Sequence, residues 1–197
     1  MRVILASGSA RRRELLKLII KEYEVIPSAS DENIGCYPPE DTVMRLSEMK
    51  AQDVFDRVDD SLNELLVIGS DTVVALDDAI LGKPASEEEA FDMLKSLKNR
   101  AHKVFTGVTL IMRDRERKVT SSTFYEETLV FVSDMTDEEI RAYVKTGEPM
   151  DKAGAYGIQT EFARYVTGIE GDYQNVVGLP VAKLYAELKD MEVIKVL

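Results

Sequence analysis

The sequence predicts an α/β protein with a mixed, twisted sheet and flanking helices. Apolar runs of strand length alternate with segments whose apolar residues recur at helical spacing. Two further strand-like segments, 104–112 and 119–132, are joined by the charged turn 113–118, which indicates a hairpin. A sheet with both kinds of connection is mixed. The length of 197 residues favours a single domain, 1–197, because single cores stop growing at about 250 residues.

The first part of the chain is expected to alternate strands and helices. Residues 2–6 form a short apolar run, and residues 9–20 carry Leu and Ile at helical spacing. Alternation predicts a second strand at 22–27, followed by a loop rich in Ser, Asp, Asn, Gly and Pro. A helix is expected at 40–58.

The rest of the chain continues the pattern and adds the hairpin. In chain order we expect a strand at 65–76, a helix at 86–97, the hairpin, a helix at 136–146 ended by Gly147, a loop at 151–159, and a final helix at 180–189 before a short C-terminal strand.

Net charge and composition exclude several function classes. A formal charge of −11 repels DNA and acidic membrane surfaces, so neither is expected as a partner. A small anion can still bind where a few cations gather, because close charges are screened less than distant ones. With a single cysteine, Cys36, and a single histidine, His102, the chain has neither an internal disulfide nor a Cys/His zinc cluster. Any catalytic metal must therefore bind oxygen ligands.

No targeting signal is expected from the first residues of the sequence. Its longest apolar stretch, Val3–Ala6, is shorter than the roughly 7–15 residues of a signal-peptide core or the roughly 20 of a membrane helix. We therefore expect a cytoplasmic protein. The oligomeric state stays open, with a homodimer as one alternative.

Three consecutive arginines occupy the first turn of the predicted 9–20 helix, where the helix dipole disfavours cations. Helical phase directs Arg13 to solvent and holds Arg11 and Arg12 near the apolar side. With the hydroxyls of Ser7 and Ser9 and the free amides of a helix start, these arginines form a candidate phosphate site. A solvated basic helix end is the alternative.

Two charged residues fall at positions that are otherwise apolar. Lys50 lies on the apolar stripe of the 40–58 helix, either as a functional cation or with its stem packed and its ammonium reaching water. Asp71 interrupts the run LLVIGSDTVVAL, and a carboxylate buried there without partners would cost several kcal/mol. It must be paired, hold a metal, or bond backbone amides in a strand-end turn.

Other polar residues are weak signals individually. Lys83 precedes a proline, and Asp31 and Glu32 are adjacent acids in a loop, where charged residues are common. His102 and Tyr156 are most simply interpreted as packed residues, because a lone histidine at a strand start more often packs than catalyses.

Taken together, seven motifs resemble the Maf proteins, in order from residue 5 to the last helix. They are LASGSARR at 5–12, LSEMKA at 46–51, GSDTVV at 69–74, LGKP at 81–84, HKVFTGV at 102–108, DKAGAYGIQ at 151–159 and GDYQNVVGLP at 171–180. The resemblance implies a nucleotide pyrophosphatase fold with a cleft between two lobes, similar in shape to inosine triphosphate pyrophosphatases.

The resemblance also implies roles for individual residues. The family's phosphate-binding turn is matched by Ser7, Arg11 and Arg12, its phosphate lysines by Lys50 and Lys83, its conserved acid by Glu32 and its catalytic base by Asp71. Where the family usually has proline, this chain has Ala10, which removes a residue that pre-sets the first helical turn but no ligand.

The family has one branch acting on dTTP and UTP and another acting on 7-methyl-GTP. Thr72 and the stretch ending at Gln159 resemble the pyrimidine branch, and Arg12 is a further candidate for base selection. The alternatives are a 7-methyl-GTP pyrophosphatase and a nucleotide-sensing regulator of septum formation without essential turnover.

The implied reaction is hydrolysis of a nucleoside triphosphate between its α and β phosphates. A divalent cation, Mg²⁺ or Mn²⁺, is expected on Asp71 and Glu32, which also activate water. The cations Arg11, Arg12, Lys50 and Lys83 are expected to bind the triphosphate, with the Ser7–Ser9 turn holding one phosphate.

Overall fold

A computed structural model describes residues 1–30, 35–58, 64–77 and 79–194. The predicted acids Asp31 and Glu32 lie outside the described residues. The chain divides into two compact units. Unit 1 comprises 1–71, 106–126 and 178–197, and unit 2 comprises 72–105 and 127–177.

The sheet has seven strands, in the order β2-β1-β3-β5-β6-β7, with β4 paired to β3. Their bounds are β1 (Arg2–Leu5), β2 (Glu24–Val25), β3 (Leu65–Leu76), β4 (Ala79–Leu81), β5 (Ala101–Arg113), β6 (Val119–Val132) and β7 (Val166–Glu170). β1 pairs parallel with both β2 and β3, whereas β4 and β7 pair antiparallel with β3 and β6. The predicted mixed sheet is thus confirmed, and β3, β5 and β6 each contribute residues to both units.

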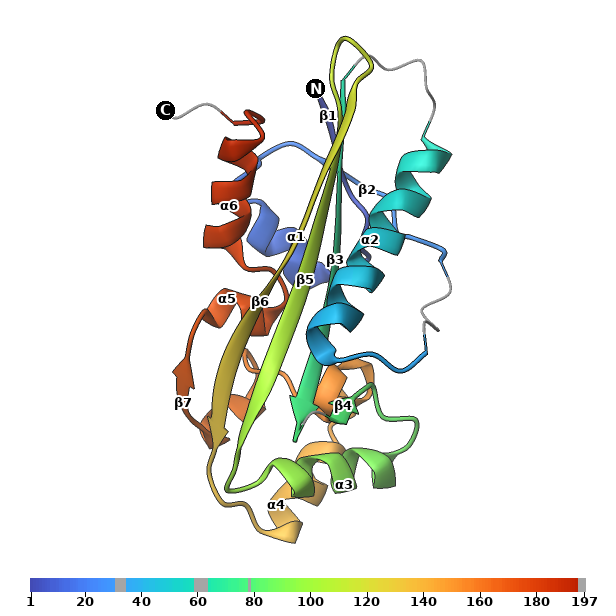
Figure 1. Cartoon of the computed structure of the whole chain (residues 1–197). Coiled ribbons are helices and arrows are strands. Elements are labelled where there is room, and N and C mark those ends of the chain that lie inside the picture. The colour runs from blue at the N-terminus through green and yellow to red at the C-terminus, as the bar shows by residue number, and fades with distance from the viewer. Residues whose placement is uncertain (31–34, 59–63, 78, 195–197) are drawn as a thin grey trace. The chain divides into compact units, whose positions relative to one another are not determined.

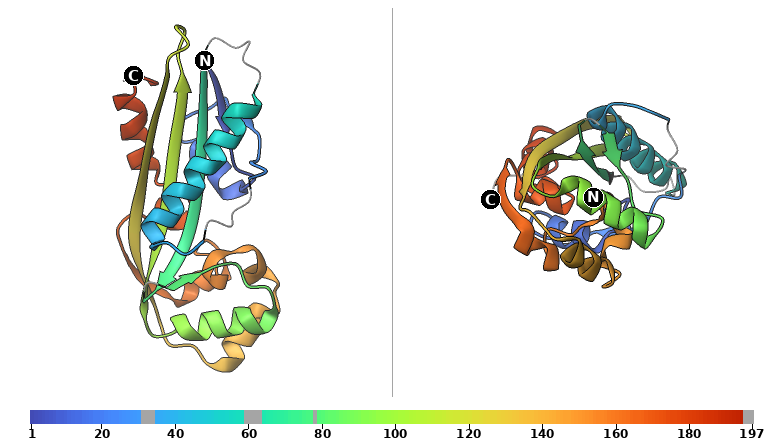
Figure 2. Two further views of the ribbon diagram at one scale, coloured as in Figure 1. Left: turned by 45° about the vertical axis from the view of Figure 1, so that its right-hand side comes forward. Right: turned by 90° about the horizontal axis from the view of Figure 1, so that it is seen from below.

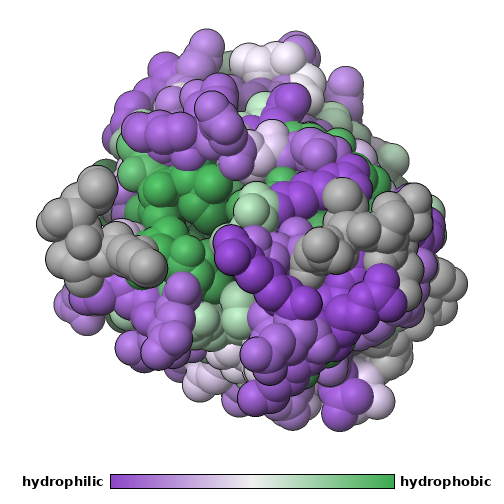
Figure 3. Space-filling view, turned by 90° about the horizontal axis from the view of Figure 1, so that it is seen from above, coloured by the Kyte–Doolittle hydropathy of each residue, from purple (hydrophilic) through white to green (hydrophobic). Residues whose placement is uncertain are grey.

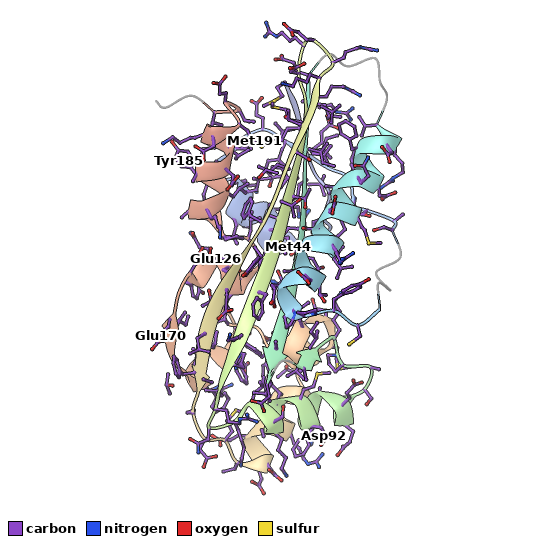
Figure 4. All side chains as sticks on the ribbon, viewed as in Figure 1. Met44, Asp92, Glu126, Glu170, Tyr185 and Met191 are labelled. Atoms are coloured by element: carbon purple, nitrogen blue, oxygen red, sulfur yellow. The ribbon has the colours of Figure 1, made fainter. Side chains whose placement is uncertain are left out.

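In unit 1 the helices cover both faces of the sheet (Figure 1, Figure 2). The helices are α1 (Ala10–Leu16), α2 (Pro39–Arg57) and α6 (Val181–Asp190). In Figure 4, Met44 is labelled on α2, Tyr185 on α6 and Met191 at the C-cap of α6. The chain passes from β1 through α1 to β2 and returns through α2 to β3, so β1 lies at the point where the strand order reverses.

Alternating residues of β1 and β3 build two separate cores. One core joins Leu5 and Ile68 to Leu16 of α1 and Leu184 of α6. The other joins the intervening residues of the same strands, including Val67, to α2. This is the pattern expected of strands buried on both faces, and it accounts for their continuous apolar runs.

Two glycines let α2 lie unusually close to the sheet. A Cβ on Gly69 of β3 would be 2.2 Å from the Ser47 carbonyl oxygen. A Cβ on Gly107 of β5 would be 2.2 Å from the Val43 carbonyl oxygen. Any side chain at these positions would push the helix away, so glycine sets how deeply Lys50 on α2 sits over β3.

Unit 2 packs short helices and turns around its own stretches of the long strands. α3 (Glu87–Leu97) is capped by Ser86 and contacts α4 (Asp137–Val144), whose Thr136 and Glu139 form a capping box. Short 3-10 turns η1 (Glu148–Asp151), η2 (Ala153–Ala155) and η3 (Glu161–Tyr165), and the helix α5 (Tyr173–Val177), complete the unit.

Several predicted boundaries are wrong. The 9–20 helix ends at Leu16, because the chain tightens into 3-10-type bonds from Leu18 N–H to Leu15 O and from Ile19 N–H to Leu16 O. The strand at 22–27 shortens to the two residues of β2. At 191–194 the structure shows a turn and no strand, and 195–197 lie outside the described residues. Within the part of the chain that is described, no helix has the length and apolar character to cross a membrane.

Candidate active site

The Ser7-Gly8-Ser9 turn follows the carboxyl end of β1 and leads directly into α1. Ser9 is the N-cap, and its Oγ accepts a hydrogen bond from the Arg12 backbone N–H at 3.4 Å. Ser7 Oγ accepts from the Ser9 N–H at 3.3 Å. The cap therefore sets the first helical turn even though Ala10 stands where the family usually has proline.

The Arg12 side chain folds back over this turn. Its Nη1 donates to Ser7 Oγ at 3.1 Å, and its Nε donates to the Gly178 carbonyl oxygen at 2.9 Å. Ser70 Oγ donates to the same carbonyl at 3.4 Å. The Gly178 carbonyl thus links the start of α1 to β3, one residue before Asp71.

The other two arginines follow the predicted helical phase. Arg13 is exposed, whereas Arg11 and Arg12 are half-buried. No carboxylate among the described residues pairs with Arg11.

Lys50 and Asp71 form a buried ion pair on the α2 side of the sheet. Lys50 Nζ donates to Asp71 Oδ1 at 2.6 Å, and each side chain is 11% exposed. The packed lysine stem is as predicted, but the ammonium ends on a carboxylate. The alternative of a strand-end turn for Asp71 is wrong, because Asp71 lies within the continuous strand β3.

These two clusters flank the end of β1. Ser70 and Asp71 are consecutive strand residues and point to opposite faces of the sheet. β1 pairs with β3 only as far as Ile68, with a last bond from Ala6 N–H to Ile68 O. Open α/β sheets bind ligands at such a reversal of strand order, outside the carboxyl ends of the strands. Unit 1 therefore brings Ser7, Ser9, Arg12, Lys50 and Asp71 to one end of β1.

The residues that are described contain no group of three or more His, Cys, Asp or Glu side chains suited to a metal ion. Asp71 supplies one carboxylate, and Glu32 is outside the described residues. Mg²⁺ in nucleotide sites is commonly held by one or two carboxylates together with substrate phosphates and water. The described residues of unit 1 offer such an ion the carboxylate of Asp71, whose Oδ1 is bonded to Lys50.

Unit 2 holds the remaining predicted site residues. Thr72 is half-buried in β3, whereas Lys83 and Gln159 are exposed. The Gly154 N–H donates to the Gly82 carbonyl oxygen at 3.0 Å. This bond ties the segment that leads to Gln159 to the turn that carries Lys83.

Gly154 must be glycine for two reasons. Its φ of +66° is left-handed, and an added Cβ would meet three side-chain atoms of Val74 at 2.9 Å. The DKAGAYGIQ segment therefore seats directly on β3, a contact that the spacing of the motif alone does not predict.

His102 and Tyr156 form a packed pair in unit 2. His102 is 2% exposed, and its Nε2 lies 2.7 Å from the Tyr156 hydroxyl. Burial lowers the pKa of His102 to about 4 and raises the pKa of Tyr156. The histidine is therefore neutral at physiological pH, and the structural interpretation of both residues holds.

Two contributors to the site were not predicted from the sequence. Gly178 acts through its carbonyl oxygen, and Ser70 acts through its bond to that oxygen. Both residues fall inside recognised motifs, GDYQNVVGLP and GSDTVV. Motif membership was the available signal, because nothing in the residue types indicates a contact over 108 positions of sequence.

Comparisons with known proteins find relatives that match nearly the whole chain. The family described as Maf-like protein matches residues 2–191. A protein of Lachnoclostridium phytofermentans named dTTP/UTP pyrophosphatase is 47% identical over 187 residues, covering 95% of this chain and 93% of its own. Another of that name, from Agathobacter rectalis, is 47% identical and covers 97% and 98%. The structure of the Staphylococcus aureus Ham1 protein is 16% identical, with a TM-score of 0.42 over 97% of this chain and 100% of its own.

Proposed function

The chain belongs to the Maf-like protein family, as its motifs indicated, and is a nucleotide pyrophosphatase. We propose that it hydrolyses dTTP and UTP to the nucleoside monophosphate and pyrophosphate. The observation that carries this proposal is the buried Lys50–Asp71 pair, which flanks the end of β1 opposite the Ser7–Arg12 turn. The end of β1 thus carries a candidate base, phosphate donors and cations.

The turn supplies the phosphate site. Ser7 and Arg12 are already joined by a hydrogen bond, so an arriving phosphate meets donors whose positions are fixed. Guanidinium groups bind phosphate oxygens through paired, charge-assisted bonds, which suits Arg11 and Arg12. Lys50 and Lys83 are proposed as the further phosphate cations.

Asp71 is proposed as the general base. It accepts a proton from water while the water oxygen attacks phosphorus, and the bridging oxygen leaves with pyrophosphate. Lys50 holds the Asp71 carboxylate through Oδ1 in the free protein. When the triphosphate binds, Lys50 gains a second anionic partner and can release Asp71 toward the water.

A divalent cation, Mg²⁺ or Mn²⁺, would be held by Asp71 and Glu32. When bound, it would neutralise phosphate charge and make pyrophosphate a better leaving group. The protein's own part is to orient the phosphates with Arg12 and to receive the proton at Asp71.

A regulator that binds nucleotide without turnover is the candidate of a different class. Such a protein should present an apolar docking patch. Figure 3 shows an apolar area of the surface among polar side chains. Turnover therefore has to separate the two candidates.

The test is pyrophosphate release by the purified chain, with and without Mg²⁺ or Mn²⁺. We expect metal-dependent release from dTTP and UTP, with little from CTP or 7-methyl-GTP. Nucleotide binding without release would favour the regulator. A preference for 7-methyl-GTP would instead place the chain in the sister branch.

A further inference from the structure

Glu148, at the start of η1, is linked to both sides of the segment that carries Gln159, directly to Thr160 and through Tyr143 to Gly157. Its Oε1 accepts a hydrogen bond from the Tyr143 hydroxyl at 2.8 Å and another from Thr160 Oγ1. The Tyr143 oxygen in turn accepts from the Gly157 N–H at 3.2 Å. Thr160 Oγ1 also lies 2.7 Å from the Gly157 carbonyl oxygen. The carboxylate thus connects to the Gly157 backbone through Tyr143 and to the Thr160 side chain directly.

Close packing fixes the same place. A Cβ on Gly157 would lie 2.8 Å from Thr160 Oγ1, 2.9 Å from Lys152 Cε and 3.0 Å from Glu148 Oε1. Glycine is therefore needed for the carboxylate to reach its partners. Lys152 also contacts Glu148, because its Nζ donates to the Glu148 carbonyl oxygen at 2.7 Å.

The direction of the bonds follows from protonation. Tyr143 is 3% exposed, and burial together with its bond to Glu148 raises the pKa of its hydroxyl. The hydroxyl therefore stays protonated. It donates to the carboxylate and accepts from Gly157 N–H, so the chain Gly157–Tyr143–Glu148 has a defined polarity.

We propose that Glu148 and Tyr143 are positioning residues for base selection, acting by holding the 157–160 turn in the conformation that presents Gln159. This inference rests on the proposed function, because it takes Gln159 as the group that reads the base. It adds two residues that act through the turn and not on the substrate.

The need for such a brace comes from the chemistry of the amide. Gln159 is exposed, and an amide can flip to offer its donor and acceptor in either order. Uracil and cytosine differ by that order at N3 and the neighbouring exocyclic group. The flip itself is a side-chain rotation, so a second group, for which Thr72 is a candidate, must fix it. A fixed turn keeps the amide within reach of that group, whereas a mobile turn would let the amide move away and serve both bases.

The test compares the wild type with Tyr143→Phe and Glu148→Gln. The measurements are the Kd values of UMP and CMP by calorimetry, and kcat/KM for UTP and CTP. We expect each variant to lower the preference for the uracil nucleotide by at least about fivefold. Deuterium exchange at the 157–160 amides should speed up in parallel. If the two residues only stabilised the fold, their substitution would weaken the binding of both nucleotides equally.

Tyr165→Phe is the matched control. Tyr165 packs on Phe162, as does Tyr143, with ring centroids 5.6 Å and 5.4 Å away. Its hydroxyl is not part of the chain of bonds around Glu148, so the base preference should be unchanged. A Gln159→Ala background provides a second check, because there the Tyr143→Phe change should no longer alter the ratio.

The outcomes distinguish this inference from the proposed reaction. An unchanged UMP:CMP ratio in both variants, with faster exchange at 157–160, would overturn the inference and leave the pyrophosphatase standing. Equal binding of UMP and CMP by the wild type would overturn it as well. Loss of the ratio in the variants of a protein that releases no pyrophosphate would support the brace and refute the proposed reaction.

Discussion

Lys50 Nζ on α2 and Asp71 Oδ1 on β3 lie 2.6 Å apart in a pair whose side chains are each 11% exposed. Removing one partner of a buried pair leaves the other charge desolvated. The loss of stability is larger when the charge that remains cannot reach water. Lysine has a long stem that can carry its ammonium to water, whereas the Asp71 carboxylate is fixed to a central strand. The two residues should therefore respond differently to mutation.

The first prediction is that Asp71→Asn folds but loses turnover, while Lys50→Met loses turnover and also stability. We expect Lys50→Met to lower the free energy of unfolding by about 3 kcal/mol, and Asp71→Asn by clearly less. Urea unfolding and pyrophosphate release measure the two effects. Release by Asp71→Asn within about tenfold of wild type, a barrier change of about 1.4 kcal/mol, would exclude Asp71 as the essential base.

The second prediction separates two adjacent arginines. Arg12 is held by Ser7 and Gly178, whereas Arg13 is exposed. We expect Arg12→Ala to lower kcat/KM by at least about tenfold through lost phosphate contacts, and Arg13→Ala to change it little. Steady-state kinetics with dTTP measures both. Equal losses at the two positions would contradict the assignment of Arg12 to the phosphate site.

The third prediction concerns the close approach of α2. Gly69→Ala places a methyl group 2.2 Å from the Ser47 carbonyl oxygen, so the helix must shift. Overpacking of this kind costs about 1–3 kcal/mol, and the shift should also disturb the Lys50–Asp71 distance. Gly82→Ala is the control, because a Cβ added at Gly82 would meet no atom within 4 Å. Equal stability of the two variants would show that α2 tolerates displacement.

The long buried elements of this fold could be predicted, and the short ones could not. The strand at 65–76 has the predicted bounds because every residue but Thr72 is buried, and burial is what an apolar run reports. The 9–20 helix was overextended because Leu18 has the right spacing but is 59% exposed. Strands β4 and β7 are partly exposed and are defined by pairing with β3 and β6, which local pattern does not encode.

The candidate site shows the same division. Apolar surroundings marked Lys50 and Asp71 as unusual one at a time, but their pairing depends on how closely α2 approaches β3 at Gly69. The anchor of Arg12 is a backbone carbonyl, which every residue has, so no residue type could identify Gly178 in advance. Side chains of unusual type for their surroundings could be singled out from the sequence, whereas the contacts of Ser70 and Gly178 could not.

The fourth prediction uses the only histidine in the chain. Burial lowers the pKa of His102 from 6.5 to about 4 in the folded state. Between these values the unfolded chain binds more protons, so the His102 contribution to stability is present above about pH 6.5 and is lost as pH falls toward 4. Protonation of His102 in the unfolded chain should therefore lower the free energy of unfolding by about 2 kcal/mol between pH 7 and pH 5.

Urea unfolding of wild type and His102→Gln at pH 7 and pH 5 measures this contribution. Glutamine keeps a hydrogen-bonding group near Tyr156 and does not titrate, so the variant should lose less stability on acidification. The difference between the two proteins isolates the histidine from the carboxylates. An equal loss of stability in the two proteins would mean that His102 has the same protonation in the folded and unfolded states.

The last prediction is that Gln159 sets the choice of base. Its amide offers an acceptor and a donor side by side, which matches the N3–H and adjacent carbonyl of uracil and thymine. A 7-methylguanine base carries a positive charge and suits a carboxylate or an aromatic face better. We expect dTTP and UTP to be preferred over 7-methyl-GTP by at least about 10²-fold in kcat/KM, because sites built on paired hydrogen bonds discriminate strongly. In Gln159→Glu that preference should shrink, since the carboxylate cannot donate to the base carbonyl. Gln52→Glu adds the same charge at an exposed position of α2 and should keep the wild-type ranking, so a ranking unchanged in both variants would show that another residue reads the base.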